Sequence, residues 1–328
     1  MTKNNGRVLW LDNLKAFGII LVVLGHAPSI DGYFANFIYS FHMPLFFFAA
    51  GCTYKKKTLK LHFNSLITNL FLPYVFFLVI SYVYWLVAND YSPIKIHLHD
   101  IINAFLFGSS IDNNFYFNPP MWFFSALISL KVLAIIVEKT FKDNRLIVSF
   151  IVSVTAITVL NNSEMRLPQG VDIALTSLFF YFIGEWVFDN NSFVFSENWK
   201  NYLVTLLCFA LVLLLSLING RVDVNTLNFS NEAIYLVNAI IGILMVFYLS
   251  QICGEVRTFN YIAKNTIWYF PLHGFVFALF TLVLIKVFDI DKSIKDDNLL
   301  FSVIYTIGAF LVISACVKIK NKIGFRYF

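Results

Sequence analysis

Apolar runs that are long enough to cross the hydrocarbon core of a bilayer recur along this 328-residue chain. A transmembrane helix needs about 20 predominantly apolar residues. Hydrophobic residues make up 59% of the chain and the mean hydropathy is +0.74, which is beyond the range of a soluble globular domain. The pattern predicts an all-α, polytopic transmembrane bundle that forms a single domain over residues 1–328, without a separate soluble domain. About ten spans are expected, at 14–30, 35–52, 66–88, 119–138, 145–160, 171–189, 201–219, 233–252, 265–288 and 299–317.

The distribution of lysine and arginine predicts the orientation of the bundle, because cytoplasmic loops carry an excess of both. With the N-terminus inside the cell, six lysines and arginines fall in outer segments and Lys131 lies within a span. All the others fall in inner segments. Both termini are therefore predicted to be cytoplasmic, with the protein in the plasma (inner) membrane. The net charge of +5 then reflects topology and proximity to anionic headgroups, so membrane lipids are expected partners and nucleic acid is not. The outer segments hold Lys95, Arg166, Arg221, Lys286, Lys292 and Lys295.

Neither the cysteines nor the paired histidines predict a metal site. Four cysteines lie in or beside separate spans without paired spacing, which argues against a disulfide framework and a zinc site. His97 and His99 fall in an expected interfacial helix over 94–107, and at a spacing of two residues their rings point to different helix faces. We therefore expect no metal.

The first span carries two ionisable residues, Lys15 and His26. Eleven residues are about three helical turns, so the two side chains share one helix face and lie roughly 16 Å apart along the axis. Ionisable residues inside a membrane are costly and usually mark function. Two alternatives remain open. Without a function, His26 would be a buried polar residue bonded to a neighbouring helix. Lys15 would likewise snorkel to the interface beside Asp12.

His42 lies in the outer half of the second span, at a depth similar to that of His26. Two imidazoles on neighbouring helices are expected to share one polar cavity. Trp122 begins the fourth span at the same outer side, where it either walls that cavity or serves as an interfacial tryptophan.

Two further side chains are functional candidates within the spans. Lys131 lies inside the fourth span and requires a partner or a cavity. His273 is expected about a third of the way into the ninth span from the cytoplasm. Pro271 just before it frees a backbone carbonyl, which His273 or a neighbour is expected to satisfy.

Four stretches together resemble the acyltransferase family 3 membrane proteins, and in particular their fucose 4-O-acetylase-like branch. The likeness covers nearly the whole chain. Two positions depart from the family pattern: Lys15 replaces the usual arginine and so loses its bidentate fork, and Asn69 stands where a basic residue often occurs. The matching stretches are Trp10–Lys15 through to His26, Phe41–Phe48 with Gly51, Pro120–Phe123, and Leu272–His273.

The resemblance implies a ten-helix O-acyltransferase that uses cytoplasmic acyl-CoA, usually acetyl-CoA, as a co-substrate and binds no permanent cofactor. The acceptor would be a hydroxyl of a cell-surface or lipid-linked glycan. Lys15 and Lys131 would hold the phosphates of the donor, and Trp122 and His273 would contact the acceptor.

For the chemistry, His26 is expected to act as the general base. His42 would orient His26 or stabilise the oxyanion. An acetyl-histidine intermediate on His26 is the alternative mechanism.

Two other classes of function fit a bundle with intramembrane charge. One is a transporter or flippase for a lipid-linked glycan or polysaccharide, and the other is a structural subunit of a glycan-assembly complex. The enzyme interpretation is favoured because a cation and two imidazoles follow one depth axis, whereas acidic residues within the spans are few.

Overall fold

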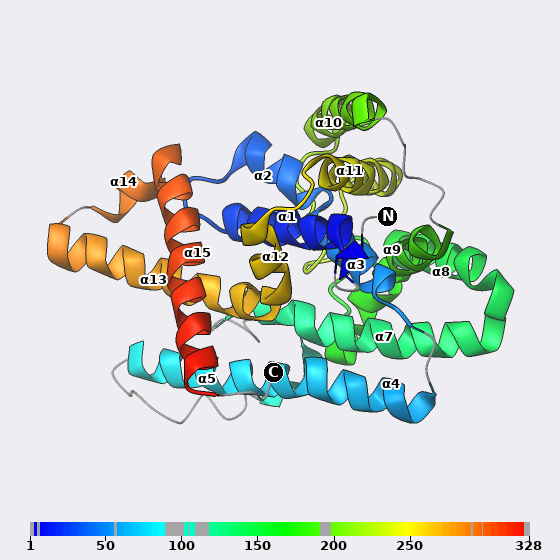
Figure 1. The fold of residues 1–328 in the computed structure, drawn as a ribbon, viewed down its shortest axis with the longest axis horizontal. Coiled ribbons are helices and arrows are strands. Elements are labelled where there is room, and N and C mark those ends of the chain that lie inside the picture. Colours follow the sequence, from blue (N-terminus) through cyan, green and yellow to red (C-terminus); the bar gives the residue numbers. More distant parts are fainter. Residues whose placement is uncertain are drawn as a thin grey trace. The chain divides into compact units, whose positions relative to one another are not determined.

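The structure is a computed structural model that describes residues 3–4, 7–55, 58–88, 102–103, 105–108, 118–190, 198–289, 291–296 and 298–324. Nearly all of these residues are helical (Figure 1), which confirms the predicted helical class. A short antiparallel pair of strands, β1 (Lys3–Asn4) and β2 (Arg7–Val8), precedes the first helix. His97 and His99 lie outside the described residues.

The chain forms two compact units, each assembled from separate stretches of sequence. The first unit comprises Met1–Ala49, Asn191–Val222 and Ala233–Tyr327. The second comprises Ala50–Asn190 and Asp223–Glu232. The single domain expected over residues 1–328 stays a prediction.

Long helices dominate both units. Helix α3 begins in the first unit and ends in the second. The first unit contains α1 (Leu9–Gly25), α2 (Gly32–Tyr39), α3 (His42–Cys52), α10 (Asn198–Asn219), α11 (Glu232–Ile252), α12 (Arg257–Lys264), α13 (Thr266–Phe288), α14 (Lys292–Asp296) and α15 (Leu299–Lys322). The second contains α4 (Leu59–Leu66), the π-helix η1 (Ile67–Phe71), α5 (Leu72–Ala88), η3 (Pro119–Met121), α7 (Trp122–Phe141), η4 (Lys142–Asn144), α8 (Arg145–Leu160), η5 (Pro168–Gly170) and α9 (Val171–Asn190).

Eight helical stretches in the described part of the chain are long and apolar enough to cross a membrane. One of them, Pro119–Leu160, has 42 residues and includes both α7 and α8, which were expected to be two spans. Helix α1 has 17 residues and is not among the eight. The chain is thus a multi-pass membrane protein, while the count of ten spans and the cytoplasmic termini stay predictions. The other seven are Gly32–Cys52, Leu59–Leu86, Pro168–Asn190, Trp199–Asn219, Glu232–Ile252, Thr266–Phe288 and Leu299–Lys322.

The second predicted span is broken, because α2 ends at Tyr39 and α3 begins at His42. Pro44 explains the break. Its ring lacks an N–H and would clash with the carbonyl of Ser40 in a continuous helix, but it is tolerated in the first turn of a new helix. Two side chains bind carbonyl groups at the end of α2. The Ser40 hydroxyl donates to Phe37 at 2.8 Å, and His42 Nδ1 lies 2.9 Å from the carbonyl oxygen of Ile38.

In the first unit, α1 packs against α2, α12, α13 and α15. Leu14, Ile19 and Val22 of α1 are fully buried. Helix α11 approaches the break in the second span closely, because a Cβ atom on Gly242 would overlap the ring of Phe41. The close approach of Gly242 therefore fixes the position of Phe41, the residue immediately before His42.

In the second unit, α8 and α9 pack along each other. Ser153 of α8 connects them, since its hydroxyl donates to the carbonyl of Leu175 at 2.8 Å and accepts from the N–H of Phe179 at 3.0 Å. Small hydroxyl-bearing residues of this kind allow membrane helices to approach closely.

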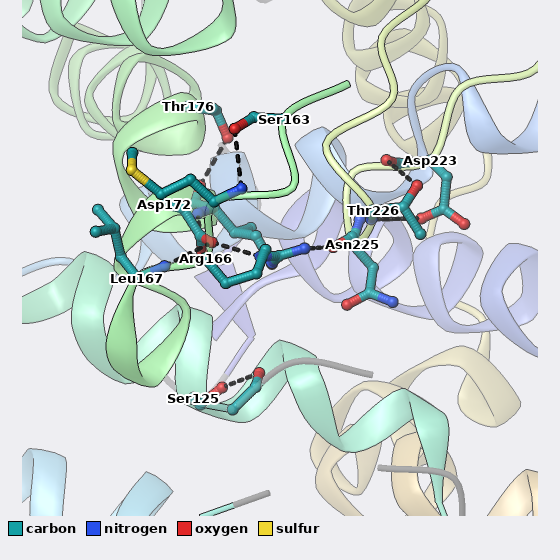
Figure 2. A network of polar contacts seen from close by, with 12 residues as sticks. Ser125, Ser163, Arg166, Leu167, Asp172, Thr176, Asp223, Asn225 and Thr226 are labelled. Carbon is teal, nitrogen blue, oxygen red and sulfur yellow. Dashed lines mark hydrogen bonds and ion pairs between the residues drawn. The ribbon is translucent and has the colours of Figure 1, made fainter. Parts of the chain in front are cut away.

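A polar network joins the loop before α9 to the segment 223–232, also within the second unit (Figure 2). Arg166 donates to the carboxylate of Asp172 at 2.6 Å and to the carbonyl of Asn225 at 2.7 Å. The Asp172 side chain is fully buried. The charge pair is desolvated, so loss of one partner would leave a buried charge without compensation.

Candidate functional site

Three histidines of the first unit form a cluster, in which Tyr39 contacts His26 and His42 and His273 contacts His26. His26 caps the C-terminus of α1, His42 is the first residue of α3, and His273 lies within α13. The ring centroids of His26 and His273 are 5.1 Å apart. The ring of Tyr39 lies 6.0 Å from that of His26 and 4.8 Å from that of His42. Tyr39 therefore connects the two imidazoles that were expected to share a site.

Each of these imidazoles makes the same contact with the backbone. Nδ1 of His26 lies 2.8 Å from the carbonyl oxygen of Val22, and Nδ1 of His273 lies 3.2 Å from that of Tyr269. His42 makes the equivalent contact at the helix break. Because a carbonyl oxygen only accepts, a neutral ring held in this way carries its hydrogen on Nδ1 and has its lone pair on Nε2.

The three histidines differ in exposure. His42 and His273 are 2% and 0% exposed, whereas His26 is exposed at the end of its helix. Nε2 of His273 is buried and has no hydrogen-bond partner among the described residues. An unsatisfied buried nitrogen of this kind is costly. This buried nitrogen belongs to a ring that contacts the ring of the exposed His26.

The contact between His273 and His26 corrects the expected depth of His273. Counting residues into the span placed His273 a third of the way in from the cytoplasm, well below His26. Counting residues from the start of the span is misleading here, because α12, which precedes α13, already lies beside α1. The ring of Phe259 in α12 contacts that of Phe17 in α1 at 5.0 Å. Helix α13 therefore starts inside the bundle. In addition, His273 binds the carbonyl of Tyr269, whereas the carbonyl that Pro271 frees four residues before it belongs to Ile267.

Arg221 is a site residue that sequence reasoning missed. It follows α10 after Gly220 and is exposed. Its guanidinium carbon lies 3.4 Å from the centroid of the Tyr39 ring, a close cation–π contact. The sequence signal for Arg221 was that it is one of the few positively charged residues in the predicted outer segments.

Lys15 occupies the position in α1 that the spacing predicts. The helix is continuous from Leu9 to Gly25, so Lys15 and His26 share a face and lie roughly 16 Å apart along its axis. Lys15 is partly buried. The opposite face of α1 contributes Phe17, Ile20 and Leu21 to an apolar cavity of 400 Å³. This cavity has an apolar lining, whereas Lys15 and His26 lie on the other face of α1.

The second unit contains the other two candidates. Lys131 of α7 lines a cavity of 80 Å³ together with Lys55 and His62. The ring of Tyr54 stacks on that of His62 at 5.4 Å, and its hydroxyl donates to the carboxylate of Glu138. This cavity combines positive charge with hydroxyl groups, the chemistry that phosphate binding requires.

Trp122 is buried at the start of α7. Its ring makes an edge contact with that of Phe123 at 6.0 Å. Its expected role in the wall of the histidine cavity stays a prediction.

The described residues contain no group of three or more His, Cys, Asp or Glu side chains that is able to hold a metal ion. All four cysteines are free thiols.

Comparison with known families shows the family of this chain. The model of an acyltransferase domain matches residues 8–318. The chain belongs to acyltransferase family 3. The matched region includes all three clustered histidines, Lys15 and Lys131. Together with the apolar helices, membership of the family fits an integral-membrane acyltransferase. No curated protein and no solved structure matches the chain. The fucose 4-O-acetylase-like branch stays a prediction.

Proposed function

We propose that this family 3 acyltransferase transfers an acyl group, acetyl in the first instance, from cytoplasmic acyl-CoA to a hydroxyl of a cell-surface or lipid-linked glycan. In this proposal it resides in the plasma membrane with both termini in the cytoplasm. The observation that carries the proposal is the state of His26. Its Nδ1 contacts the carbonyl of Val22, so a neutral ring has its basic lone pair on Nε2.

His26 acts as the general base of the transfer. As Nε2 takes the proton from the acceptor hydroxyl, the hydroxyl oxygen attacks the carbonyl carbon of the thioester. The carbon–sulfur bond then breaks, and the departing thiolate of CoA receives the proton from His26. A base positioned in this way contributes typically 10²–10⁴-fold to a rate.

His42 orients the site. A neutral His42 held by the carbonyl of Ile38 has an accepting Nε2 and cannot donate to an oxyanion. Of the two roles expected for His42, orientation of His26 through the shared contact with Tyr39 therefore fits the geometry better than stabilisation of an oxyanion.

Lys15 and Lys131 bind the phosphates of the donor. Lys15 lies about three turns from His26 on the same face of α1, so an extended thioester arm would run along that face. Lys131 shares its cavity with the basic residues Lys55 and His62, which suits a phosphate group. Trp122 and His273 contact the acceptor, and the unsatisfied Nε2 of His273 accepts a hydrogen bond from one of its hydroxyl groups.

The test uses the purified full-length protein in lipid nanodiscs with radiolabelled acetyl-CoA and glycan fractions from whole cells. We expect alkali-labile label, which is characteristic of an O-acetyl ester, to appear in one glycan fraction. Label that remains on CoA in every fraction would contradict the proposal. In proteoliposomes, movement of a lipid-linked glycan without any acyl donor would instead support a transporter.

The same preparation decides between the two mechanisms. Without an acceptor, an acetyl-histidine route would release one CoA per protein in a rapid burst and leave the label on the protein, and His26→Ala would show neither. A general-base route would leave the protein unlabelled while transfer to the glycan proceeds.

A further inference from the structure

The apolar cavity of 400 Å³ beside α1 lies entirely within the first unit. Helices α1, α10 and α11 line it, together with side chains on both sides of the break between α2 and α3. Its volume falls within the range of ligand pockets, which is roughly 300–1,000 Å³. Apolar cavities stay dry and bind apolar molecules, so a hydrocarbon is the chemistry that fits this one.

The cavity is continuous with the lipid-facing surface of α10. Leu206 and Phe209 of this helix line the cavity and are also 66% and 44% exposed. Because α10 is one of the helices able to cross the membrane, its exposed apolar side chains face lipid tails, which are as apolar as leucine. A hydrocarbon chain therefore reaches the cavity from the bilayer without crossing water.

The helix break connects this cavity to the histidine cluster. Phe37 and Phe41 line the cavity, and their rings contact each other at 5.4 Å. Between them in sequence, Tyr39 contacts the rings of His26 and His42, and His42 directly follows Phe41. One short segment of chain thus lines the apolar cavity and holds the histidines. A ligand with a hydrocarbon chain and a hydroxyl-bearing head group would contact both.

Asn238 lies on the face of α11 that lines the cavity. Met245, Leu249 and Ile252 line the cavity and follow Asn238 at intervals of about two, three and four helical turns, so the four residues share one helix face. Gly242 lies on the same face, one turn after Asn238. Asn238 is therefore placed beyond one end of the cavity.

This end of the cavity adjoins the histidine site. A Cβ atom on Gly242 would overlap the ring of Phe41, which places Gly242 at the level of the residue before His42. Asn238 lies one turn away, about 6 Å along the axis of α11. The order along α11 is therefore the apolar cavity, the contact with Phe41, and then the amide of Asn238.

The amide of Asn238 destabilises the fold unless a ligand binds it. The residue is 0% exposed, and neither its nitrogen nor its oxygen has a hydrogen-bond partner within the described ranges. A buried amide without partners is unfavourable, and an apolar side chain of the same shape would not be. A ligand group that accepts from the N–H donors and donates to the oxygen would satisfy it.

We propose that the acceptor is a lipid-linked saccharide, whose hydrocarbon chain lies in this cavity and whose phosphate linkage binds the amide of Asn238. This inference rests on the proposed function and selects the lipid-linked glycan from the two acceptor classes named there. The N–H donors of Asn238 would bind a phosphate oxygen, and a hydroxyl of the first sugar would donate to its oxygen. The sugar would then extend past Phe41 toward His26.

The two substrates would occupy opposite faces of α1. Lys15 and His26 share one face of the helix, whereas Phe17 and Leu21 face the cavity. The donor and the lipid chain would therefore bind at the same time without competing.

Photo-crosslinking reads out lipid binding without acyl transfer. The full-length protein in nanodiscs receives a polyprenyl phosphate with a diazirine at the far end of its chain, and mass spectrometry identifies the crosslinked peptides. We expect crosslinks to residues 205–209 and 245–252, which an excess of unlabelled polyprenyl phosphate reduces by about tenfold. The same excess of phosphatidylglycerol should not reduce them. Equal competition by the two lipids would overturn the inference, because the cavity would then hold bulk lipid only.

Two tryptophan substitutions in α10 form a matched pair. Thr205→Trp places a large side chain in the cavity lining and should reduce the competed crosslinks by about fivefold or more. Leu207 is 55% exposed and is not part of that lining, so Leu207→Trp should crosslink as the wild type does. Both variants should bind acyl-CoA with an unchanged dissociation constant. Wild-type crosslinking in a folded Thr205→Trp protein would contradict the assignment of the cavity.

Asn238→Leu separates a ligand contact from a structural role. Leucine is similar in size and removes the unsatisfied amide, so the melting temperature should stay the same or rise. The affinity for polyprenyl phosphate should fall about tenfold, as expected for the loss of a hydrogen bond. An unchanged affinity in Asn238→Leu would contradict the role of Asn238.

The inference and the proposed function fail in different ways. With radiolabelled acetyl-CoA, we expect the label in the glycan fraction that extracts into organic solvent with its lipid. Competed crosslinks without acyl transfer to any glycan would contradict the proposed function and support the lipid site. Acyl transfer only to glycans without lipid, together with no competed crosslinks, would overturn the inference and support the proposed function.

Discussion

The imidazoles of His26 and His273 lie edge to face, with 5.1 Å between their centroids and 62° between their planes. One ring caps α1 and is exposed, and the other lies within α13 and is fully buried. Residues from opposite ends of the sequence thus form one polar cluster. Ionisable residues inside a membrane bundle usually mark a functional site.

His273→Asn should weaken binding of the acceptor. Asparagine keeps an amide donor near the carbonyl of Tyr269 but removes Nε2, which we assign to a hydroxyl of the acceptor. Loss of one neutral hydrogen bond predicts a rise of about tenfold in the KM for the acceptor, with little change in the KM for acyl-CoA. Initial rates with each substrate varied in turn provide the measurement, and an equal rise in both KM values would contradict this role.

Lys131→Gln should raise the KM for acyl-CoA by about tenfold or more, because a hydrogen bond to a charged group contributes roughly 1.5–3 kcal/mol. The KM for the acceptor should stay the same. Lys139→Gln, on the same helix but exposed, is the matched control and should have no effect. If both variants bind acyl-CoA as the wild type does, the cavity around Lys131 is not a phosphate site.

Gly242→Ala should destabilise the first unit and reduce activity together. The added methyl group would overlap the ring of Phe41 and displace the residue before His42, and overpacking of this kind costs about 1–3 kcal/mol. Gly274→Ala is the control, since its Cβ would meet nothing within 4 Å and alanine favours a helix. Thermal unfolding in detergent and transfer assays would test this pair. An unchanged melting temperature in Gly242→Ala would show that the contact does not constrain Phe41.

Asp172→Asn should lower the free energy of unfolding by about 3–5 kcal/mol, because it leaves Arg166 as a buried charge without its counterion. Asp296→Asn removes a half-exposed partner of Lys295 and should have little effect, as is usual for surface ion pairs. Unfolding in mixed micelles provides the comparison. Equal stability of the two variants would mean that the network in Figure 2 does not stabilise the second unit.

The sequence predicts the helical elements well, because apolar runs in a membrane protein have few alternatives to a helix. Each of the ten expected runs overlaps a helix of the structure. The break between Tyr39 and His42 was missed, although Pro44 is a sequence signal for it. A hydropathy average over many residues does not detect a helix break, because the break depends on the local cost of one proline inside a helix.

The candidate site was predictable only in part. The spacing of Lys15 and His26 follows from helical geometry, and that pair is where the sequence suggests. Contacts of His273 and Arg221 depend on how α12 and the segment after α10 pack, and neither appears as a periodic pattern. Asp172 illustrates the same limit, because its position at the end of a span suggests an interface, whereas its partner Arg166 is found only in the folded loop.

The most direct test of the account is the rate of acyl transfer by His26→Ala, in the same nanodiscs and with the same acceptor fraction as the wild type. Size-exclusion chromatography and thermal unfolding would first show that the variant folds. The account predicts that the transfer rate falls by about 10²–10⁴-fold, while acyl-CoA still binds with an unchanged dissociation constant. A folded His26→Ala protein that transfers acetyl groups at the wild-type rate would contradict the central claim.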